Sequence, residues 1–511
     1  MQKIRPQFNP LPLCDTKSIH SPLRNINDDC AWVPLVGSSA DFPAEIFGPA
    51  ISQLLYHPEY NSTLILRTEI VSESGTDFPR ESPSIVGYTP IRCIRRKLLP
   101  RRPGRDEGLE QYCTLYGHAN EHNDGDDATP SLLVLTPILG AGGALPYYHP
   151  RVSHLAFRYV PSDPPTIRIE VVPLPDTPMD LNSRLYRTCL ALLDTLHRYG
   201  WGTVTQYKKR VIHDRVVSRE EYQDLYLVLR ERHKHLVNEW HEVTDPLKHV
   251  FEDIGIATFL MLLWKQMYHK KDQETSQESL AEEPWKTWPR PLAGFLDLGC
   301  GNGLLTHILA EEGYEGHGID VRARTSWSHY PEATQKHLHV EALNPTSLAQ
   351  PGYQHPYLAP GVFLVGNHAD ELTPWVPIVA TLCSASGYLS IPCCAWTFDS
   401  RFERSQNLPF ETGIDVDQFT ETLHLGGDGS NSSSYSQYRI WLASLSLHCG
   451  WQVESETLRI PSTRNWALIG HSWTTHEQAE GARRRVLNIV DEVRCRGIFQ
   501  TRRPEGKAGD H

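Results

Sequence analysis

No two of the 11 cysteines form a C-x-x-C pair, and no apolar run is long enough to cross a membrane. Cys393 and Cys394 are neighbours in sequence, a spacing unsuited to a zinc clamp or to a mutual structural disulfide. The longest strongly apolar run, residues 254–264, is too short for a bilayer, and the first residues lack the apolar stretch of a secretion signal. We therefore expect reduced thiols, no bound metal, no membrane partner and a cytoplasmic location.

The chain also lacks an excess of basic side chains. Its formal net charge is -12, which by itself argues against a nucleic-acid partner. The basic residues are clustered, however, and residues 92–105 hold seven of them, with further clusters at 208–210, 483–485 and 494–503. Each cluster could be an ordinary solvated face. Combined with a nucleoside-type cofactor site, the clusters favour a polyanionic substrate.

A glycine-rich turn directly follows an apolar strand and supplies that cofactor site. Residues 295–303 read FLDLGCGNG, and LLTHILAEEG continues with helical spacing. Glycines let the backbone turn tightly and approach a ligand, and the carboxyl end of a parallel strand is where nucleotides bind. A second short strand, EGHGID, ends in Asp320, placed to accept hydrogen bonds from both ribose hydroxyls of a nucleoside. The two signals predict an S-adenosylmethionine-dependent methyltransferase.

The glycine spacing separates this turn from a nicotinamide fingerprint. A G-x-G-x-x-G loop starting at Gly299 needs a third glycine at position 304, where Leu304 stands. A glycine-rich turn that binds nothing is the alternative. Asp297 before the turn and Asp320 at the end of the next strand argue against that alternative.

Two kinds of domain are indicated by the remaining patterns. Residues 131–174 carry β-branched and aromatic residues typical of strands, while 181–199, 218–240 and 245–268 have apolar residues at helical spacing. These elements predict an α+β amino-terminal domain. Strand-like and helix-like segments then alternate, which predicts a doubly wound, Rossmann-like α/β domain of the class I methyltransferases. Its later strands are predicted at 336–343, 361–371, 386–394 and 465–473.

Five divisions of the chain are expected from these patterns. They are an irregular extension at 1–90, the α+β domain at 91–268, a polar linker at 269–289, the methyltransferase domain at 290–475 and a helix with a basic tail at 476–511.

Several segments together resemble the eukaryotic tRNA uracil-2'-O-methyltransferase family. They are FLDLGCGNGLL, EGHGIDVRARTSW, VGNHADELTPWVP, IPCC and RIPSTRNWALIG, with RRKLLPRR, LPYYHPRV, KKRVIHD and TDPLKHVFEDIGIA before them. The likeness extends from about Arg92 to Gly470, and NHADELTPW is more selective than the cofactor turn. It implies S-adenosylmethionine as cofactor and methylation of the ribose of uridine 44 in serine tRNA, with the amino-terminal domain as a further place for tRNA contacts and no role for DNA.

The resemblance also implies the residues of the site. The cofactor would be bound by Asp297, Gly299, Gly301, Asn302, Gly303, Asp320, Leu343, Asn344 and Asn367. A ribose hydroxyl is a poor nucleophile unless its proton passes to an acceptor, for which the candidates are His368 and Asp370. His368 could instead be a structural histidine that bonds the turn, and Asp370 could be a helix N-cap.

Lysine is absent between Lys336 and Lys507, so the chain does not show the lysine-aspartate-lysine-glutamate tetrad of other ribose methyltransferases. Arginine suits bidentate phosphate contacts instead. The candidate RNA-binding residues are Arg95, Arg96, Lys97, Arg101, Arg102, Lys208, Lys209, Arg322, Arg324 and Arg464. Any of these could equally be a surface residue.

Three alternatives stay open at this point. The first is a methyltransferase of a protein or small molecule, and the second is an RNA-binding scaffold without turnover. The third is a thiol nucleophile at Cys393 or Cys394, which Pro392 and the apolar flank disfavour. The identity of any accessory protein is open as well.

Overall fold

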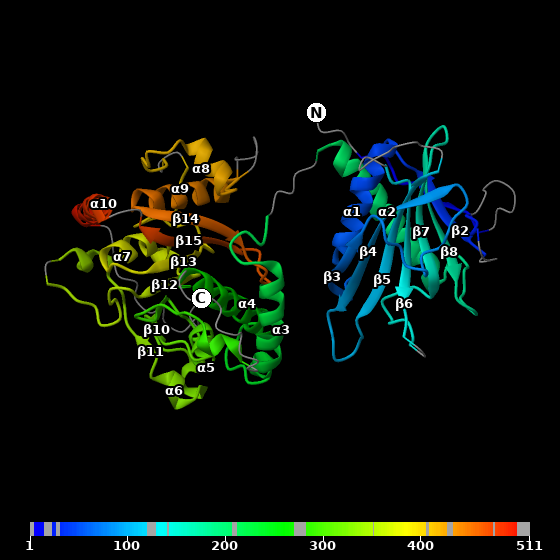
Figure 1. The fold of residues 1–511 in the computed structure, drawn as a ribbon. Coiled ribbons are helices and arrows are strands. Elements are labelled where there is room, and N and C mark those ends of the chain that lie inside the picture. The colour runs from blue at the N-terminus through cyan, green and yellow to red at the C-terminus, as the bar shows by residue number, and fades with distance from the viewer. Residues whose placement is uncertain are drawn as a thin grey trace, which may run out of the picture. The chain divides into compact units, whose positions relative to one another are not determined.

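The computed structural model describes residues 5–14, 23–26, 31–119, 129–140, 143–206, 212–269, 283–350, 352–404, 408–426, 433–473 and 476–497. The chain forms two compact units, Met1–Lys208 and Lys209–His511 (Figure 1). The division lies well before the expected boundary at residue 268. It does so because the helices after residue 218 pack on the sheet of the second unit.

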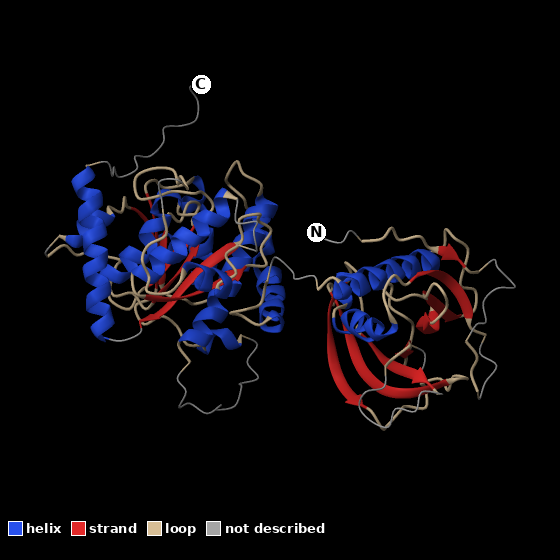
Figure 2. Cartoon of the chain, turned by 90° about the horizontal axis from the view of Figure 1, so that it is seen from above, coloured by secondary structure: helices blue, strands red, loops and turns tan. Residues whose placement is uncertain are grey.

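Among its described residues, the first unit contains an eight-stranded antiparallel sheet in the order β1-β2-β8-β7-β6-β5-β4-β3. The strands are β1 (Leu11–Pro12), β2 (Val33–Ser39), β3 (Ile65–Ser74), β4 (Tyr88–Pro100), β5 (Leu109–His118), β6 (Leu132–Ile138), β7 (Val152–Val160) and β8 (Thr166–Pro173). Helices α1 (Phe47–Tyr56) and α2 (Arg184–Val204) pack against one face of this curved sheet (Figure 2).

The first 90 residues are more ordered than expected. They contain β2, α1 and β3, and both strands are integral to the sheet, because β2 pairs with β8 and β3 pairs with β4. The pairing of β2 with β8 joins residues that lie far apart in sequence, such as Val33 and Val171. Weak local periodicity in this region therefore concealed strands whose stability comes from tertiary packing.

The second unit contains, in its described part, a seven-stranded sheet in the order β11-β10-β9-β12-β13-β15-β14. The strands are β9 (Phe295–Leu298), β10 (Gly316–Asp320), β11 (Leu338–Val340), β12 (Phe363–Asn367), β13 (Gly387–Ile391), β14 (Trp451–Thr457) and β15 (Trp466–Trp473). Strands β9 to β13 pair in parallel, and β15 pairs antiparallel to both β13 and β14. The direction in which successive strands are added to the sheet reverses at β9, because β10 lies on one side of it and β12 on the other. Ligands of such sheets bind in the crevice beside the carboxyl ends of the strands at this point.

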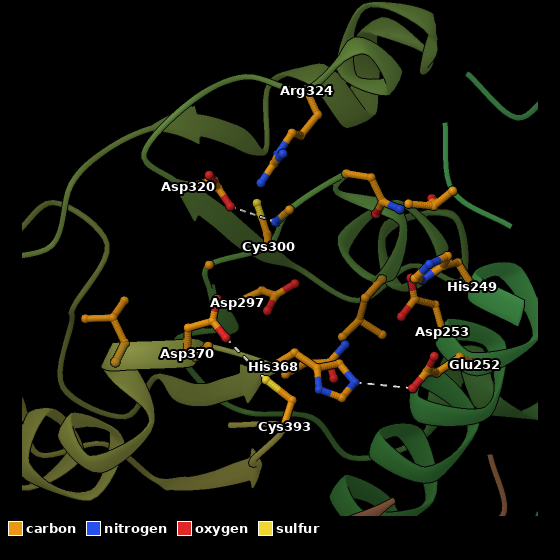
Figure 3. A pocket seen from close by; sticks show the side chains of 18 of the residues that line it. His249, Glu252, Asp253, Asp297, Cys300, Asp320, Arg324, His368, Asp370 and Cys393 are labelled. Carbon is orange, nitrogen blue, oxygen red and sulfur yellow. Dashed lines mark hydrogen bonds and ion pairs between the residues drawn. The ribbon is translucent and has the colours of Figure 1, made fainter. Parts of the chain in front are cut away.

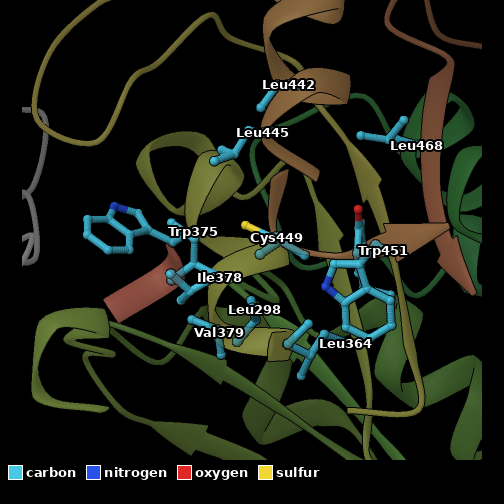
Figure 4. Packing of buried hydrophobic residues seen from close by; sticks show 14 of the residues in the cluster. Leu298, Leu364, Trp375, Ile378, Val379, Leu442, Leu445, Cys449, Trp451 and Leu468 are labelled. Atoms are coloured by element: carbon cyan, nitrogen blue, oxygen red, sulfur yellow. The ribbon is translucent and has the colours of Figure 1, made fainter. Parts of the chain in front are cut away.

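Helices cover both faces of this sheet. Successive side chains of β12 point to opposite faces. Leu364 packs with α7 and α9 on one face, and Phe363 and Val365 pack with α4 and α5 on the other. Figure 4 shows the first of these layers around Leu298 and Leu364. The helices of the second unit are α3 (Arg219–His233), α4 (Pro246–Met267), α5 (Leu304–Glu311), α6 (Glu332–Gln335), α7 (Val376–Leu382), α8 (Val416–Thr422), α9 (Ser434–His448) and α10 (His476–Arg496).

Two helix starts agree with the sequence signals. Ser218 caps α3 by accepting a hydrogen bond from Glu221 N, and Asp245 caps α4 by accepting one from Leu247 N, with Pro246 at the first helical position. Helix α4 is buried along most of its length and ends against β9 and β12. Within the described residues, no helix has both the length and the apolar character needed to cross a membrane.

Candidate active site

The turn after β9 has three glycines in the left-handed region, with φ of 73° at Gly299, 55° at Gly301 and 76° at Gly303. A Cβ at Gly301 would meet nothing within 4 Å, so this part of the turn faces open space. A Cβ at Gly303 would lie 2.8 Å from Leu338 Cδ1. Gly301 therefore leaves room for a ligand, whereas Gly303 is required by packing under α5.

Asp320 fixes the conformation of this turn. Its Oδ2 accepts a hydrogen bond from Gly301 N at 2.9 Å, and its Oδ1 accepts one from Arg322 N at 3.2 Å. Each carboxylate oxygen has a second lone pair, so Asp320 can hold the turn and still accept a ligand hydroxyl.

Asp297 is a buried acid at the end of β9, with 2% of its surface exposed. Its Oδ2 accepts a 3.4 Å hydrogen bond from Thr306 Oγ1, while its Oδ1 has no partner among the described residues. Burial raises the pKa of Asp297 to about 7; the Thr306 bond opposes the shift and the charge of Asp320 adds to it. A buried carboxylate with one unsatisfied oxygen is suited to a cationic ligand group.

The loop after β12 has an unusual backbone. His368 and Asp370 have φ of 54° and 47°, a conformation that costs free energy for residues other than glycine and is concentrated at functional sites. His368 Nε2 lies 3.2 Å from Glu252 Oε1 of α4, so the histidine does not bond its own turn. Asp370 begins a 3-10 helix without capping it. Neither residue has the structural role weighed as its alternative.

Helix α4 forms one wall of the site, which the sequence did not reveal. Glu252 and Asp253 are acids in the midst of a buried helix. Burial alone would raise the pKa of Glu252, but hydrogen bonding and charge from His368 lower it on balance. Burial raises the pKa of Asp253 well above its usual range, and the Glu252 charge adds to this. The available signal was an adjacent pair of acids directly before the apolar run at residues 254–264 of this helix.

These groups line one cavity of about 780 Å³ (Figure 3). Figure 3 shows Asp297 between Asp320 on one side and His368 with Glu252 on the other. The cavity is lined by these predicted site residues: Asp297, Gly299, Gly301, Asn302, Asp320, Leu343, Asn367, His368 and Asp370. Gly303 and Asn344 are not among its lining residues. Asn344 caps a 3-10 helix instead, its Oδ1 accepting from Thr346 N at 3.0 Å.

The predicted RNA-binding residues are divided by the fold. Arg322, Arg324 and Arg464 line the cavity. In the first unit, Arg95, Lys97, Arg101 and Arg102 are partly or fully exposed, and Arg95 pairs with Glu110 at 2.6 Å. Lys208 and Lys209 lie outside the described residues.

The prediction for Arg96 is corrected by its position. Arg96 is only 4% exposed, because alternation along β4 turns it inward between Ile94 and Leu98. Its guanidinium donates to Gln111 Oε1 in the interior, so it is not available to an RNA phosphate.

Comparison with known proteins agrees with this arrangement. A family model described as "TRM44-like, N-terminal bet v1-like domain" matches residues 10–210, and one described as "Predicted AdoMet-dependent methyltransferase" matches 216–281 and 285–345. The chain is 36% identical over 479 residues to a tRNA (uracil-O(2)-)-methyltransferase of Schizosaccharomyces pombe, covering 87% of this chain and 86% of that one. The chain belongs to the tRNA (uracil-O(2)-)-methyltransferase family.

Other relatives with the same name support this membership. The protein of Neurospora crassa is 32% identical over 473 residues, with 86% of each chain covered. The protein of Saccharomyces cerevisiae is 29% identical over 531 residues, with 86% of this chain and 87% of that one covered. No solved structure matches the chain.

The thiols of this family member lie beside the candidate proton acceptor. Cys393 Sγ donates a 3.3 Å hydrogen bond to Asp370 Oδ1. Burial raises the pKa of the Cys393 thiol, and the charge of Asp370 raises it further. The ligand atoms of Asp370, Cys393 and Cys394 lie within 4.8 Å of one another, a spacing able to hold a metal ion that the sequence spacing did not suggest. A raised thiol pKa, however, disfavours both metal ligation and nucleophilic attack.

Proposed function

We propose that this chain transfers the methyl group of S-adenosylmethionine to the ribose 2'-hydroxyl of uridine 44 in serine tRNA. The observation that carries the proposal is the single cavity that joins the glycine turn and Asp320 to the loop holding His368 and Asp370. A candidate cofactor position and a candidate proton acceptor thus share one cavity. The relatives' name supplies the tRNA and the uracil nucleotide. The family resemblance of the sequence supplies the position and the serine tRNA.

The strand order supports assignment of the second unit to the Rossmann-like class I methyltransferases. Five parallel strands with a reversal at β9 are followed by an antiparallel pair, and helices cover both faces. The crevice at the reversal is the general ligand position in such sheets. The cavity lies at the ends of β9, β10 and β12, in agreement with this rule.

The residues present fit the cofactor chemically. The unsatisfied Oδ1 of Asp297 suits the ammonium of the amino-acid part, Asp320 suits the ribose hydroxyls, and the open space at Gly301 admits a ligand close to the backbone. Leu343, which lines the cavity, would provide apolar contact for the adenine. When bound, S-adenosylmethionine supplies an electrophilic methyl group on its sulfonium.

The protein's own groups would position the ribose and take its proton. Asp370 is our first candidate for the acceptor, because its carboxylate lines the cavity on the same loop as His368. Glu252 fixes the imidazole of His368 through Nε2, which places the ring beside the same space. Enclosing the hydroxyl among such fixed groups lowers the entropic cost of reaction.

Replacing Glu252 with glutamine is expected to lower kcat by about tenfold to a hundredfold. The amide keeps the shape of the side chain but removes the charge that holds the His368 ring in place. Single-turnover methyl transfer should show the loss, while the KM values for cofactor and tRNA and the melting temperature stay near those of the wild type. Glu221→Gln, which removes an exposed pairing with Lys265, is the matched control and should be neutral. Equal rates for both variants would exclude a positioning role.

Arg464 is our candidate for a contact to the RNA backbone, because it lines this cavity and its side chain is exposed. Its guanidinium stacks 4.0 Å from the ring centre of Tyr435, whose hydroxyl donates to Pro392 O at 2.8 Å. No carboxylate partner of Arg464 is present among the described residues. Its donors are therefore oriented by stacking and remain available for a phosphate.

Replacing Arg464 with glutamine should raise the KM for tRNA by about threefold to tenfold, with little change in cofactor affinity. The slope of log affinity against log salt concentration should fall by about one, as for one lost phosphate contact. Filter binding across a salt series measures it. Arg496→Gln, whose guanidinium is already paired with Glu492 at 2.6 Å, is the control. An unchanged salt slope in the Arg464 variant would remove this residue from the RNA interface.

The proposed function is tested by transfer of labelled methyl to an unmodified serine tRNA transcript and to one with 2'-deoxyuridine at position 44. Label on the first alone supports ribose methylation at that site. Equal label on both points to a base or to another nucleotide. No label on either favours a protein or small-molecule substrate, an essential partner, or a scaffold without turnover.

A further inference from the structure

Two arginines of the second unit share one aromatic ring. Arg464 lies in the loop between β14 and β15, and its guanidinium carbon is 4.0 Å from the ring centre of Tyr435 on α9. Arg439 is four residues after Tyr435 on the same helix, and its guanidinium carbon is 5.5 Å from the same ring centre. Arg439 also lies 5.5 Å from the ring centre of Trp466, at the start of β15. Aromatic contacts therefore hold these two cations, the arginine pair, close together.

Neither member of the arginine pair is neutralised. Among the described residues, no carboxylate bonds the guanidinium of Arg439 or of Arg464, and the buried Nε of Arg439 has no hydrogen-bond partner. Burial lowers the pKa of Arg439; Tyr435 opposes the shift, and the charge of Arg464 adds to it. Arginine stays protonated through such a shift, so two like charges lie together in a half-buried place. An anion bound to both would offset the repulsion and supply an acceptor.

The same aromatic ring connects the arginine pair to the proposed proton acceptor. The hydroxyl of Tyr435 donates a 2.8 Å hydrogen bond to Pro392 O, directly after β13. The next residue, Cys393, donates from Sγ to Asp370 Oδ1 at 3.3 Å (Figure 3). Arg464, Cys393 and Asp370 all line the cavity. An anion held by the arginine pair would therefore lie on the side of the cavity where Asp370 lies.

The first turn of α9 favours an anion at this place as well. Tyr435 is the second residue of this 15-residue helix, and the turn contains no acidic side chain. The amino-terminal end of a helix carries a partial positive charge, which adds to that of the arginine pair. Guanidinium groups that aromatic rings hold in place are suited to the oxygens of a phosphate. Together these features indicate a site for one phosphate group.

We propose that the arginine pair binds the phosphate on the 3' side of the nucleotide that is methylated. This assignment rests on the proposed function, which supplies RNA as the substrate. In a ribonucleotide, the carbon that bears the 3'-phosphate is bonded to the carbon that bears the 2'-hydroxyl. A fixed 3'-phosphate therefore fixes the hydroxyl too, and the arginine pair positions it beside Asp370.

Binding of serine tRNA that contains one uncharged linkage tests this assignment. Three tRNAs are compared: one with ordinary phosphates throughout, one with a methylphosphonate on the 3' side of position 44, and one with a methylphosphonate on its 5' side. All three carry 2'-deoxy sugars at position 44 and at the nucleotide before it, which protect the uncharged linkage and prevent turnover. Fluorescence anisotropy in the presence of S-adenosylhomocysteine measures the affinity of each.

Arg439→Gln and Arg464→Gln should each weaken binding of the all-phosphate tRNA by about threefold to tenfold. On the 3'-methylphosphonate tRNA, which has already lost the contact, each should weaken binding by less than about twofold. The full loss should return on the 5'-methylphosphonate tRNA. Arg485→Gln, which changes a half-buried arginine that donates to His448 O, is the matched control and should bind all three tRNAs as the wild type does. The same loss on all three tRNAs overturns the assignment.

Two measurements keep the test decisive if Arg439→Gln does not fold. With the wild type, the 3'-methylphosphonate should weaken binding about tenfold, and at least about threefold more than the 5'-methylphosphonate does. Equal effects contradict the assignment. Arg439→Lys retains the charge, so it should bind the all-phosphate tRNA within about threefold of the wild type and the 3'-methylphosphonate tRNA equally well. A loss of the same size on both would assign Arg439 to packing against Trp466 and overturn its part in the site.

The wild type separates failure of this inference from failure of the proposed function. A wild-type protein that binds none of the three tRNAs contradicts the RNA substrate itself. Tight binding by the wild type, with losses in the arginine variants that do not depend on the linkage, contradicts the phosphate site alone.

Discussion

Replacing Asp370 with asparagine is expected to lower kcat for methyl transfer by about 10²- to 10⁴-fold, the usual contribution of a positioned proton acceptor. The 2'-hydroxyl must lose its proton as the methyl group arrives, and asparagine cannot accept one. Asparagine keeps the volume of the side chain, so cofactor binding should stay within about threefold of the wild type. Rapid-quench single-turnover measurements at saturating cofactor isolate the chemical step from binding.

Cys393→Ser is the matched control for this substitution. Serine retains a donor toward Asp370 Oδ1, which the thiol contacts at 3.3 Å, but removes any thiol chemistry. It should retain activity within about threefold. A loss of less than tenfold in the Asp370 variant would remove it as the acceptor, and His368→Gln would then be the decisive variant. A large loss in Cys393→Ser would reopen the thiol mechanism.

The glycine turn and its partner Asp320 could be predicted from the sequence because their signals are local. The FLDLG strand, the glycine turn and Asp320 lie within one stretch of chain, and the hydrogen bond from Gly301 N to Asp320 Oδ2 joins them. Even there, the sequence did not separate ligand space from packing. Gly301 faces the cavity whereas Gly303 makes room for Leu338, a difference that depends on the tertiary structure.

The opposite wall could not be predicted in this way. Glu252 and His368 are 116 positions apart in the sequence, and the spacing of apolar residues within a single helix or strand does not predict a contact over that separation. Arg96 could not be assigned from the composition of its segment alone. A run of basic residues suggested one charged surface, but the period of two along β4 sends Arg95 outward and Arg96 inward.

The affinity for S-adenosylmethionine is expected to fall about tenfold as the pH is lowered from 8 to 6. The pKa of Asp297 is about 7 in the free protein, against about 3.9 for an ordinary aspartate. In the proposed orientation the cofactor's ammonium would pair with the ionised form of Asp297, so below pH 7 binding would require loss of a proton from this group. The raised pKa of Asp297 has the opposite effect on the stability of the free protein, which falls as the pH rises. Because the folded pKa is raised, this group favours the folded free protein below about pH 4, and that contribution is lost as the pH rises through 7.

Calorimetric titrations of cofactor binding from pH 6 to 8 give both the affinity and the number of protons released. Asp297→Asn should bind about 10- to 100-fold more weakly at pH 8 and lose the pH dependence, since no charge remains to titrate. Asp253→Asn, which replaces another buried acid of the same cavity, should retain it. Methylthioadenosine lacks the amino-acid part and should bind the wild type equally at both pH values. If Asp297→Asn or methylthioadenosine showed the full tenfold change, Asp297 would not be the group that meets the ammonium, and the proposed orientation of the cofactor would have to be reversed.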